Sequence, residues 1–170
     1  MSLLNRGGKG MDYQVVTMED FQLLGKGEMQ LVGQVKADLF WQKCQKDGTL
    51  AKLTTYSTSD EKEWIGLADG ESFDGEGYMY YIATPYHAET VPSGYTTLTL
   101  PSSLWIKFRS ASLNVKNTAD KDCWTWIFSD FFPASEYEPA GFQLEVYPKG
   151  AGSYPDSLSE IWISVKKSSD

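Results

Sequence analysis

The stretch WTWIFSDFFPASEYEPAGFQLEVYP, residues 124–148, has the clearest structural pattern in the chain. Its first half predicts a helix over residues 117–132, because apolar side chains recur there on one helical face. These side chains are Trp124, Ile127, Phe128 and Phe131. Pro133 ends the predicted helix, since proline has no backbone N–H with which to continue it. Apolar and polar residues then alternate over residues 142–147, which predicts a strand.

The same order of elements is predicted twice along the chain. A helical pattern over residues 36–46, with Gly48 as its stop, marks the first unit. The strands predicted around that helix cover residues 13–33, 63–68 and 77–84. The strands predicted around the second helix cover residues 96–100, 104–109, 142–147 and 161–165. Two β-α-β-β units in tandem are therefore expected.

This order places the chain in the α+β class. Pairing strands across the two units gives a curved antiparallel sheet with two helices on one face, and a ligand groove is expected between the repeats. Residues 1–10 are Gly-rich and basic, so we expect a flexible leader that is a tag or a linker. The remainder, residues 11–170, is expected to be a single domain with pseudo-repeats at about 11–90 and 91–167.

Charge and composition narrow the classes of function. The formal net charge of −8 repels phosphate backbones, so no direct nucleic-acid partner is expected, although the same charge also serves solubility alone. No apolar run reaches membrane-spanning length and residues 1–10 lack a signal-peptide core, so a cytoplasmic protein without a membrane partner is predicted. Cys44, Cys123 and His87 follow no metal-ligand or nucleophile motif. We therefore expect buried free thiols, no metal and no cofactor.

Aromatic residues make up 14% of the chain, which is more than a core of this size needs. Rings with a polar atom suit the wall of a ligand site, where one side meets the core and the other meets the ligand. A core that simply favours Trp and Tyr accounts for the same composition, so this observation alone leaves both interpretations open.

The quoted stretch, together with SEIWISVK at residues 159–166, resembles the GyrI-like small-molecule-binding domain. This is also the effector-binding domain of AraC-type and multidrug-sensing transcription regulators. The shared pattern is a helix ending before Pro, an S-x-Y-E turn, an aromatic-x-x-E-x-Y-P strand and a closing E-I-W-I strand. The opening YQVVTMEDFQLLGKG, residues 13–27, is similar to the first strand of the family. Ser164 stands where the family often has Pro.

The resemblance implies a ligand in the groove between the repeats. In the family an acidic residue on the penultimate strand faces cationic, often aromatic, ligands, and that position matches Glu145 here. No helix-turn-helix pattern precedes residue 11, so the chain is similar to the stand-alone members.

The alternation of the strand that holds Glu145 gives a prediction of its own. Gln143, Glu145 and Tyr147 point to one face, and the apolar residues between them point to the other. We expect the apolar set to face the helices, which puts Glu145 on the opposite face against a ligand or against water. A carboxylate beside rings can hold a cation by charge and its flat apolar body by cation–π contact.

Several rings are candidates for the wall of the ligand site. Adjacent strand residues point to opposite faces, so Tyr80 and Tyr81 cannot both line it, whereas Tyr80 shares a face with Tyr78. Trp124 is expected to belong to the core. The candidate ligand-binding residues are Glu145, Tyr147, Trp105, Tyr80, Trp162, Tyr78 and Gln143. For each ring taken singly, plain packing is the alternative.

Three functions remain open from the sequence. The first is a stand-alone sensor or sequestering domain that binds a small cationic or aromatic ligand in an aromatic cleft with a central carboxylate. The second, implied by a gyrase-inhibiting member of the family, is a protein-interaction module. The third is a hydrolase of reactive electrophilic natural products, with Glu145 and a Tyr as its acid–base pair. A binding protein is favoured over an enzyme.

Overall fold

The structure is a computed structural model that describes residues 4–5, 12–34, 36–109, 123–147 and 160–168. The first half of the chain contains β1 (Leu4–Asn5), β2 (Asp12–Met18), β3 (Phe21–Leu31), α1 (Ala37–Lys46), α2 (Thr49–Tyr56), β4 (Trp64–Asp69), η1 (Gly70–Ser72) and β5 (Gly77–Pro85). The second half contains β6 (Thr96–Leu100), β7 (Ser103–Arg109), η2 (Ile127–Phe131), α4 (Phe132–Ala134), β8 (Tyr137–Tyr147) and β9 (Glu160–Lys167). Residues 123–126 are also helical and run directly into η2.

All these strands form one antiparallel sheet in the order β1-β2-β7-β9-β8-β4-β5-β3-β6. The first unit consists of β3, α1, α2, β4 and β5. The second unit consists of β7, the helix at residues 123–134, β8 and β9. The two units meet where β4 pairs with β8. β2, which precedes the first unit in the chain, extends the second unit, and β6, which follows β5, extends the first. The predicted tandem β-α-β-β order in a curved antiparallel sheet is confirmed.

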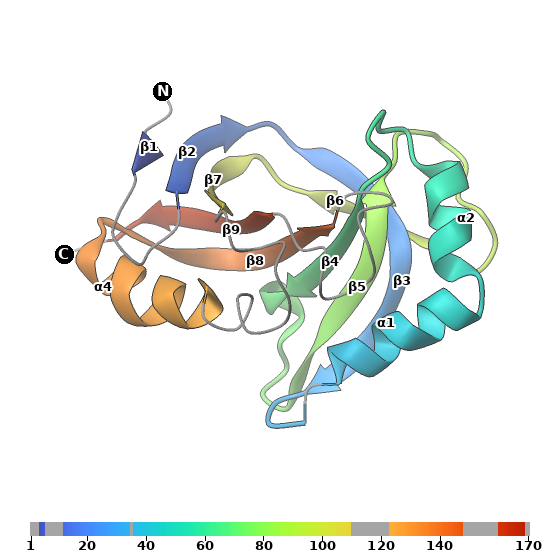
Figure 1. Cartoon of the computed structure of the whole chain (residues 1–170), viewed down its shortest axis with the longest axis horizontal. Coiled ribbons are helices and arrows are strands. Elements are labelled where there is room, and N and C mark those ends of the chain that lie inside the picture. The colour runs from blue at the N-terminus through green and yellow to red at the C-terminus, as the bar shows by residue number, and fades with distance from the viewer. Residues whose placement is uncertain (1–3, 6–11, 35, 110–122, 148–159, 169–170) are drawn as a thin grey trace.

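The helices share one face of the sheet (Figure 1). A cluster of buried side chains lies there between sheet and helices, and it takes Phe40 and Trp41 from α1, Leu53 from α2, and Ile127 and Phe131 from η2. Burial of such side chains contributes about 1.5–3 kcal/mol each, so this cluster is a main source of the stability of the domain. The prediction of helices on one face is confirmed.

The face away from the helices has a core of its own. The cluster there is built from strand residues and includes Leu23, Leu67, Trp105 and Leu144, all of which are almost completely buried. The rings of Phe21 in β3 and Trp105 in β7 lie 5.8 Å apart although four strands separate β3 from β7 in the sheet. The sheet therefore curves until its two halves touch on this face.

Two local expectations need correction. The chain adds a further helix, α2, directly after Gly48, whose φ of 85° turns the chain between α1 and α2. Phe128 was assigned to the apolar stripe of the helix predicted over residues 117–132 but is 41% exposed, and its ring packs against Trp124 and Phe132 of the same helix.

Other expectations fall partly outside the described residues. Leu4 and Asn5 of the expected leader form β1 and pair with β2, whereas the rest of residues 1–10 lies outside the description. Residues 117–122 of the predicted helix also lie outside the described residues. In the described part of the chain, no helix is long and apolar enough to cross a membrane.

Both Cys44 and Cys123 are buried thiols, as predicted. Burial raises the pKa of the Cys44 thiol to about 11, and the nearby Asp47 carboxylate adds to this effect. Because the thiolate is the reactive form, we expect native Cys44 to react with Ellman's reagent at pH 8 far more slowly than an exposed thiol. Unfolding in guanidinium should release both thiols for fast reaction. Fast reaction of Cys44 in the folded protein would contradict its placement in the core.

Candidate functional site

Glu145 lies at the centre of the sheet, where the two units meet. It is half-buried in β8 and pairs with Gly66 of β4 on one side and Ile161 of β9 on the other. The Tyr80 hydroxyl donates to Glu145 Oε1 at 3.3 Å, and the Trp124 indole Nε1–H donates to Oε2 at 3.3 Å. Each carboxylate oxygen therefore accepts a hydrogen bond from a neutral aromatic residue. Tyr80 belongs to the sheet, and Trp124 belongs to the helix at residues 123–134.

Trp41 of α1 extends this arrangement to the first helix. Its Nε1–H donates to the Tyr80 hydroxyl oxygen at 2.9 Å, and both side chains are buried, with Tyr80 5% exposed and Trp41 2% exposed. The hydrogen-bonded chain from Trp41 through Tyr80 to Glu145 runs from α1 across β5 to β8. It connects the two units on the helix-covered face. We call Trp41, Tyr80, Glu145 and Trp124 the carboxylate network.

Gly66 makes room for the carboxylate network. A Cβ atom at this position would lie 2.2 Å from the Tyr80 hydroxyl oxygen and 3.3 Å from Cζ2 of Trp41. The hydroxyl of Tyr80 thus occupies the space that any other residue at position 66 would fill with its side chain. The absence of a side chain opposite Glu145 is what allows Tyr80 to reach the carboxylate.

Tyr78 also lies near the negative charge. Burial raises the pKa of its phenol above the usual value, and the charge of Glu145 raises it further. Both effects disfavour the phenolate, so Tyr78 stays neutral over the whole physiological pH range. It contributes a ring and a hydroxyl group to this region, without a second negative charge.

The remaining two candidates on β8 share the face of Glu145. Tyr147 is fully buried, and its ring meets Trp41 edge-on with 4.9 Å between the centroids. Gln143 is half-buried and pairs with Ala68 and Ile163, which both pack in the helix-side core. Five predicted residues therefore lie on one face together: Glu145, Gln143, Tyr147, Tyr80 and Tyr78.

The face to which they point is the opposite of the predicted one. Phe142 and Leu144 were expected to face the helices, but they belong to the cluster on the far side, and Glu145 and Tyr147 face the helices instead. The error has a physical cause: both faces of the central strands are buried, so an apolar run along β8 does not identify the side that the helices cover.

Sequence reasoning missed three residues of this region. Trp124 was assigned to the core, Trp41 fell within the helical pattern over residues 36–46 without a role of its own, and Gly66 was not considered. Each had a weak signal: the two tryptophans carry the donors that a buried carboxylate needs, and Gly66 interrupts an otherwise apolar strand.

The model of one protein family, that of the integron-associated effector binding protein Cass2, matches residues 15–165. The chain belongs to the Cass2 family. Small-molecule binding is thus the function of this domain at the level of the family, and the resemblance to GyrI-like effector-binding domains is confirmed. No curated protein sequence matches the chain.

Solved structures support the same fold. A Staphylococcus aureus MU50 protein assigned to bacterial transcription regulation is 26% identical, with a TM-score of 0.68 over 92% of this chain and 99% of that one. SAV2435, solved with bound tetraphenylphosphonium, is 24% identical, with a TM-score of 0.70 over 92% of this chain and 94% of its own. The integron cassette protein VCH_CASS2 from Vibrio cholerae is 15% identical, with a TM-score of 0.63 over 91% and 95% of the two chains.

Trp105 and Trp162 lie on the other face of this Cass2-family domain. Trp105 is completely buried in the strand-only core, and the Trp162 ring packs beside it with 6.5 Å between the centroids. These two predicted residues therefore do not share a site with Glu145. Trp105 is a packing residue.

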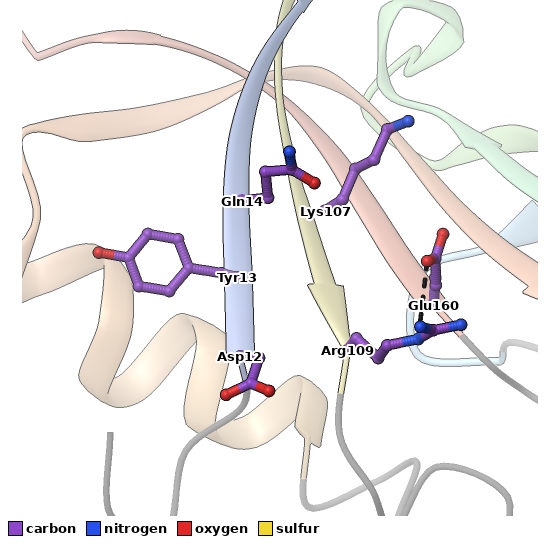
Figure 2. A pocket seen from close by; sticks show the side chains of 6 residues that line it. All are labelled: Asp12, Tyr13, Gln14, Lys107, Arg109 and Glu160. Carbon is purple, nitrogen blue, oxygen red and sulfur yellow. Dashed lines mark ion pairs between the residues drawn. The ribbon is translucent and has the colours of Figure 1, made fainter. Parts of the chain in front are cut away.

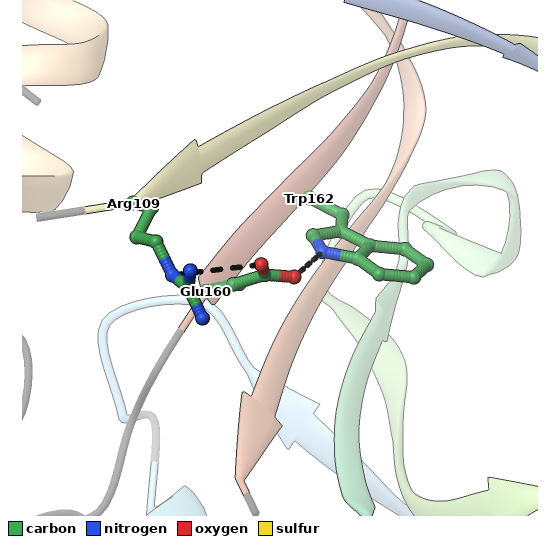
Figure 3. A network of polar contacts seen from close by, with 3 residues as sticks. All are labelled: Arg109, Glu160 and Trp162. Atoms are coloured by element: carbon green, nitrogen blue, oxygen red, sulfur yellow. Dashed lines mark hydrogen bonds and ion pairs between the residues drawn. The ribbon is translucent and has the colours of Figure 1, made fainter. Parts of the chain in front are cut away.

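Trp162 belongs to a separate polar cluster at this face (Figure 3). Its Nε1–H donates to Glu160 at 2.8 Å, and the other oxygen of Glu160 lies 3.8 Å from Arg109 Nε. The ammonium of Lys107 sits 3.8 Å above the Trp162 ring, and burial lowers the pKa of Lys107 while Glu160 opposes that change. Glu160 is therefore paired with Arg109, and Lys107 adds a second positive charge near it.

A pocket of about 250 Å³ borders this cluster (Figure 2). Its lining residues are Asp12, Tyr13, Gln14, Lys107, Arg109 and Glu160. Two cationic and two anionic side chains line it, so it favours neither sign of ligand charge. The ring of Tyr13 points away from the others, and it packs edge-on against Phe131 of η2 at 4.7 Å.

The chemistry available at Glu145 is that of a counter-ion. Within the described residues, no group of three or more His, Cys, Asp or Glu side chains could hold a metal ion. Glu145 instead presents a carboxylate held in place by neutral donors and surrounded by aromatic rings. This arrangement suits a positively charged group with apolar surface.

Proposed function

We propose that this domain binds a small organic cation with aromatic groups, and that Glu145 supplies the compensating charge. The observation that carries the proposal is the half-buried Glu145 carboxylate, which accepts one hydrogen bond at each oxygen from Tyr80 and Trp124. Both donors are neutral, so they orient the carboxylate and leave its negative charge in place. The ligand class agrees with SAV2435, a structural neighbour bound to tetraphenylphosphonium.

Electrostatics favour a cation at this position. A charge that is partly removed from water interacts more strongly with an opposite charge, because the effective dielectric constant falls from about 80 toward about 20. The rings of Trp124, Tyr78 and Phe128 add apolar and cation–π surface, and the Trp124 and Phe128 rings are nearly parallel at 12° with 6.1 Å between centroids. Charge and aromatic surface together select a cation that carries rings.

The direct test is Glu145→Gln, which removes the charge and keeps the shape. Titration with tetraphenylphosphonium, followed by calorimetry, should give an affinity at least about ten-fold weaker for the variant, because the variant loses the Coulomb attraction between the carboxylate and the cation, about 3 kcal/mol at about 6 Å with an effective dielectric constant of about 20. Glu61→Gln is the matched control: it removes the same charge from an exposed loop residue and should leave the affinity unchanged. Equal affinities of wild type and Glu145→Gln would refute the proposal.

A hydrolase is the second candidate, and one observation favours it. The Tyr80 hydroxyl and the Glu145 carboxylate are in hydrogen-bond contact, as an acid–base pair requires. An aromatic epoxide is a suitable probe of ring opening. Wild-type turnover that disappears in Glu145→Gln would support the hydrolase, and binding without turnover would support the sensor or sequestering domain.

A further inference from the structure

We propose that Trp41 is a positioning residue for cation binding, acting through Tyr80 to fix the orientation of the Glu145 carboxylate. This inference rests on the proposed function and deepens it. It assigns to α1, a helix of the first unit, control over a carboxylate that belongs to the second unit.

The direction of the hydrogen bonds is determined by the donors. An indole N–H can only donate, so the bond at 2.9 Å makes the Tyr80 oxygen an acceptor from Trp41. The single hydroxyl proton of Tyr80 then points to Glu145 Oε1, where the separation is 3.3 Å. Without the indole N–H, the hydroxyl could rotate and the bond to Glu145 would compete with other orientations.

The second oxygen of Glu145 also accepts a hydrogen bond. Trp124 is also a donor-only residue, and its Nε1–H lies 3.3 Å from Oε2. Two donor-only indoles, one at each end of the carboxylate network, thus converge on Glu145. Hydrogen bonds that run toward the same carboxylate reinforce one another and hold it in one orientation.

Burial explains why Trp41 acts indirectly. Its side chain is 2% exposed and packs edge-on against Tyr147, so it is part of the core, and Tyr80 stands between its indole N–H and Glu145. Gly66 admits the Tyr80 hydroxyl at the point where the two bonds meet. The effect of Trp41 on a ligand must therefore pass through the orientation of the carboxylate.

A positioning role and a plain packing role of Trp41 predict different effects on ligand binding. A correctly oriented carboxylate strengthens binding of a cation and has little effect on a neutral ligand of similar shape. The quantity to measure is therefore the preference for tetraphenylphosphonium over neutral triphenylphosphine oxide. A loss of packing would weaken the binding of both ligands together.

The decisive variant is Trp41→Phe, which keeps a ring and removes the N–H. We expect the affinity for tetraphenylphosphonium to fall by about three- to ten-fold, the usual effect of one neutral hydrogen bond, with the affinity for triphenylphosphine oxide unchanged. Trp64→Phe is the matched control, because the Trp64 indole packs against the same core but donates to Thr54 at 3.0 Å. It should leave the cation preference unchanged.

A double-mutant cycle tests the route through Tyr80. In a Tyr80→Phe background, Trp41→Phe should cause no further loss of cation preference, because the connection is already broken. Additive losses, or an equal fall for both ligands in Trp41→Phe, would overturn the positioning role. Thermal melting of each variant, followed by circular dichroism, checks that the affinities compared are those of folded proteins. An unchanged cation affinity in Glu145→Gln would instead contradict the proposed function itself.

Discussion

Replacement of Trp105 by alanine is expected to lower the free energy of unfolding by about 3–5 kcal/mol, the usual cost of deleting a large buried ring. Trp105 is completely buried, and its neighbours Phe21 and Trp162 would be left beside a cavity. The loss is a large part of the stability of about 5–15 kcal/mol that is typical of a domain. Urea unfolding followed by tryptophan fluorescence measures it.

The companion variant Trp105→Phe separates packing from binding. The Trp105 indole N–H has no hydrogen-bond acceptor within the described part of the chain, so phenylalanine removes no paired donor. We expect a smaller loss of stability and an unchanged affinity for tetraphenylphosphonium, because Trp105 lies on the face away from Glu145. A stable Trp105→Phe protein that binds the cation as weakly as Glu145→Gln would show that Trp105 contacts the ligand after all.

Replacement of Gly66 by alanine is expected to destabilise the protein by about 1–3 kcal/mol and to weaken cation binding. The new Cβ would lie 2.2 Å from the Tyr80 hydroxyl oxygen, so the ring must move and its bond to Glu145 must break. Urea unfolding gives the change in stability, and titration with tetraphenylphosphonium gives the change in affinity.

The Tyr80→Phe background identifies the source of this cost. Removing the hydroxyl removes the closest contact of the new Cβ and leaves the Tyr80 Cζ position at 3.1 Å, so Gly66→Ala should be less destabilising there than in the wild type. The same penalty in both backgrounds would mean that the backbone around Gly66, and not the Tyr80 hydroxyl, opposes the substitution.

The order of the elements follows from local patterns that a sequence shows directly. Alternation along β5 and β8, the apolar stripe of the helix at residues 123–134 and the turn at Gly48 each depend on a few neighbouring residues. The second helix, α2, was missed because TLAKLTTY, residues 49–56, is rich in threonine and β-branched side chains lower helix propensity. Its place in the structure comes from Leu50 and Leu53, which pack against the sheet.

The identity of the central carboxylate was predictable, whereas its surroundings were not. Glu145 stands out as a charge between apolar neighbours on a strand, and the resemblance to a known family adds to that signal. The side of the sheet on which it lies depends on how the sheet curves, and this curvature results from contacts such as that between Phe21 and Trp105. The partners Trp41 and Trp124 are distant in sequence from Tyr80, so only the folded chain shows that their N–H groups converge.

The central claim is that an aromatic cation binds beside Glu145 on the helix-covered face, and the most direct measurement is a crystal structure with tetraphenylarsonium. The arsenic atom scatters anomalously, so its position can be located independently of how the surrounding density is interpreted. We predict an arsenic peak between α1 and the helix at residues 123–134, closer to the Glu145 carboxylate than to any other acidic group. An arsenic peak only at the opposite face, beside Lys107 and Trp162, would contradict the account.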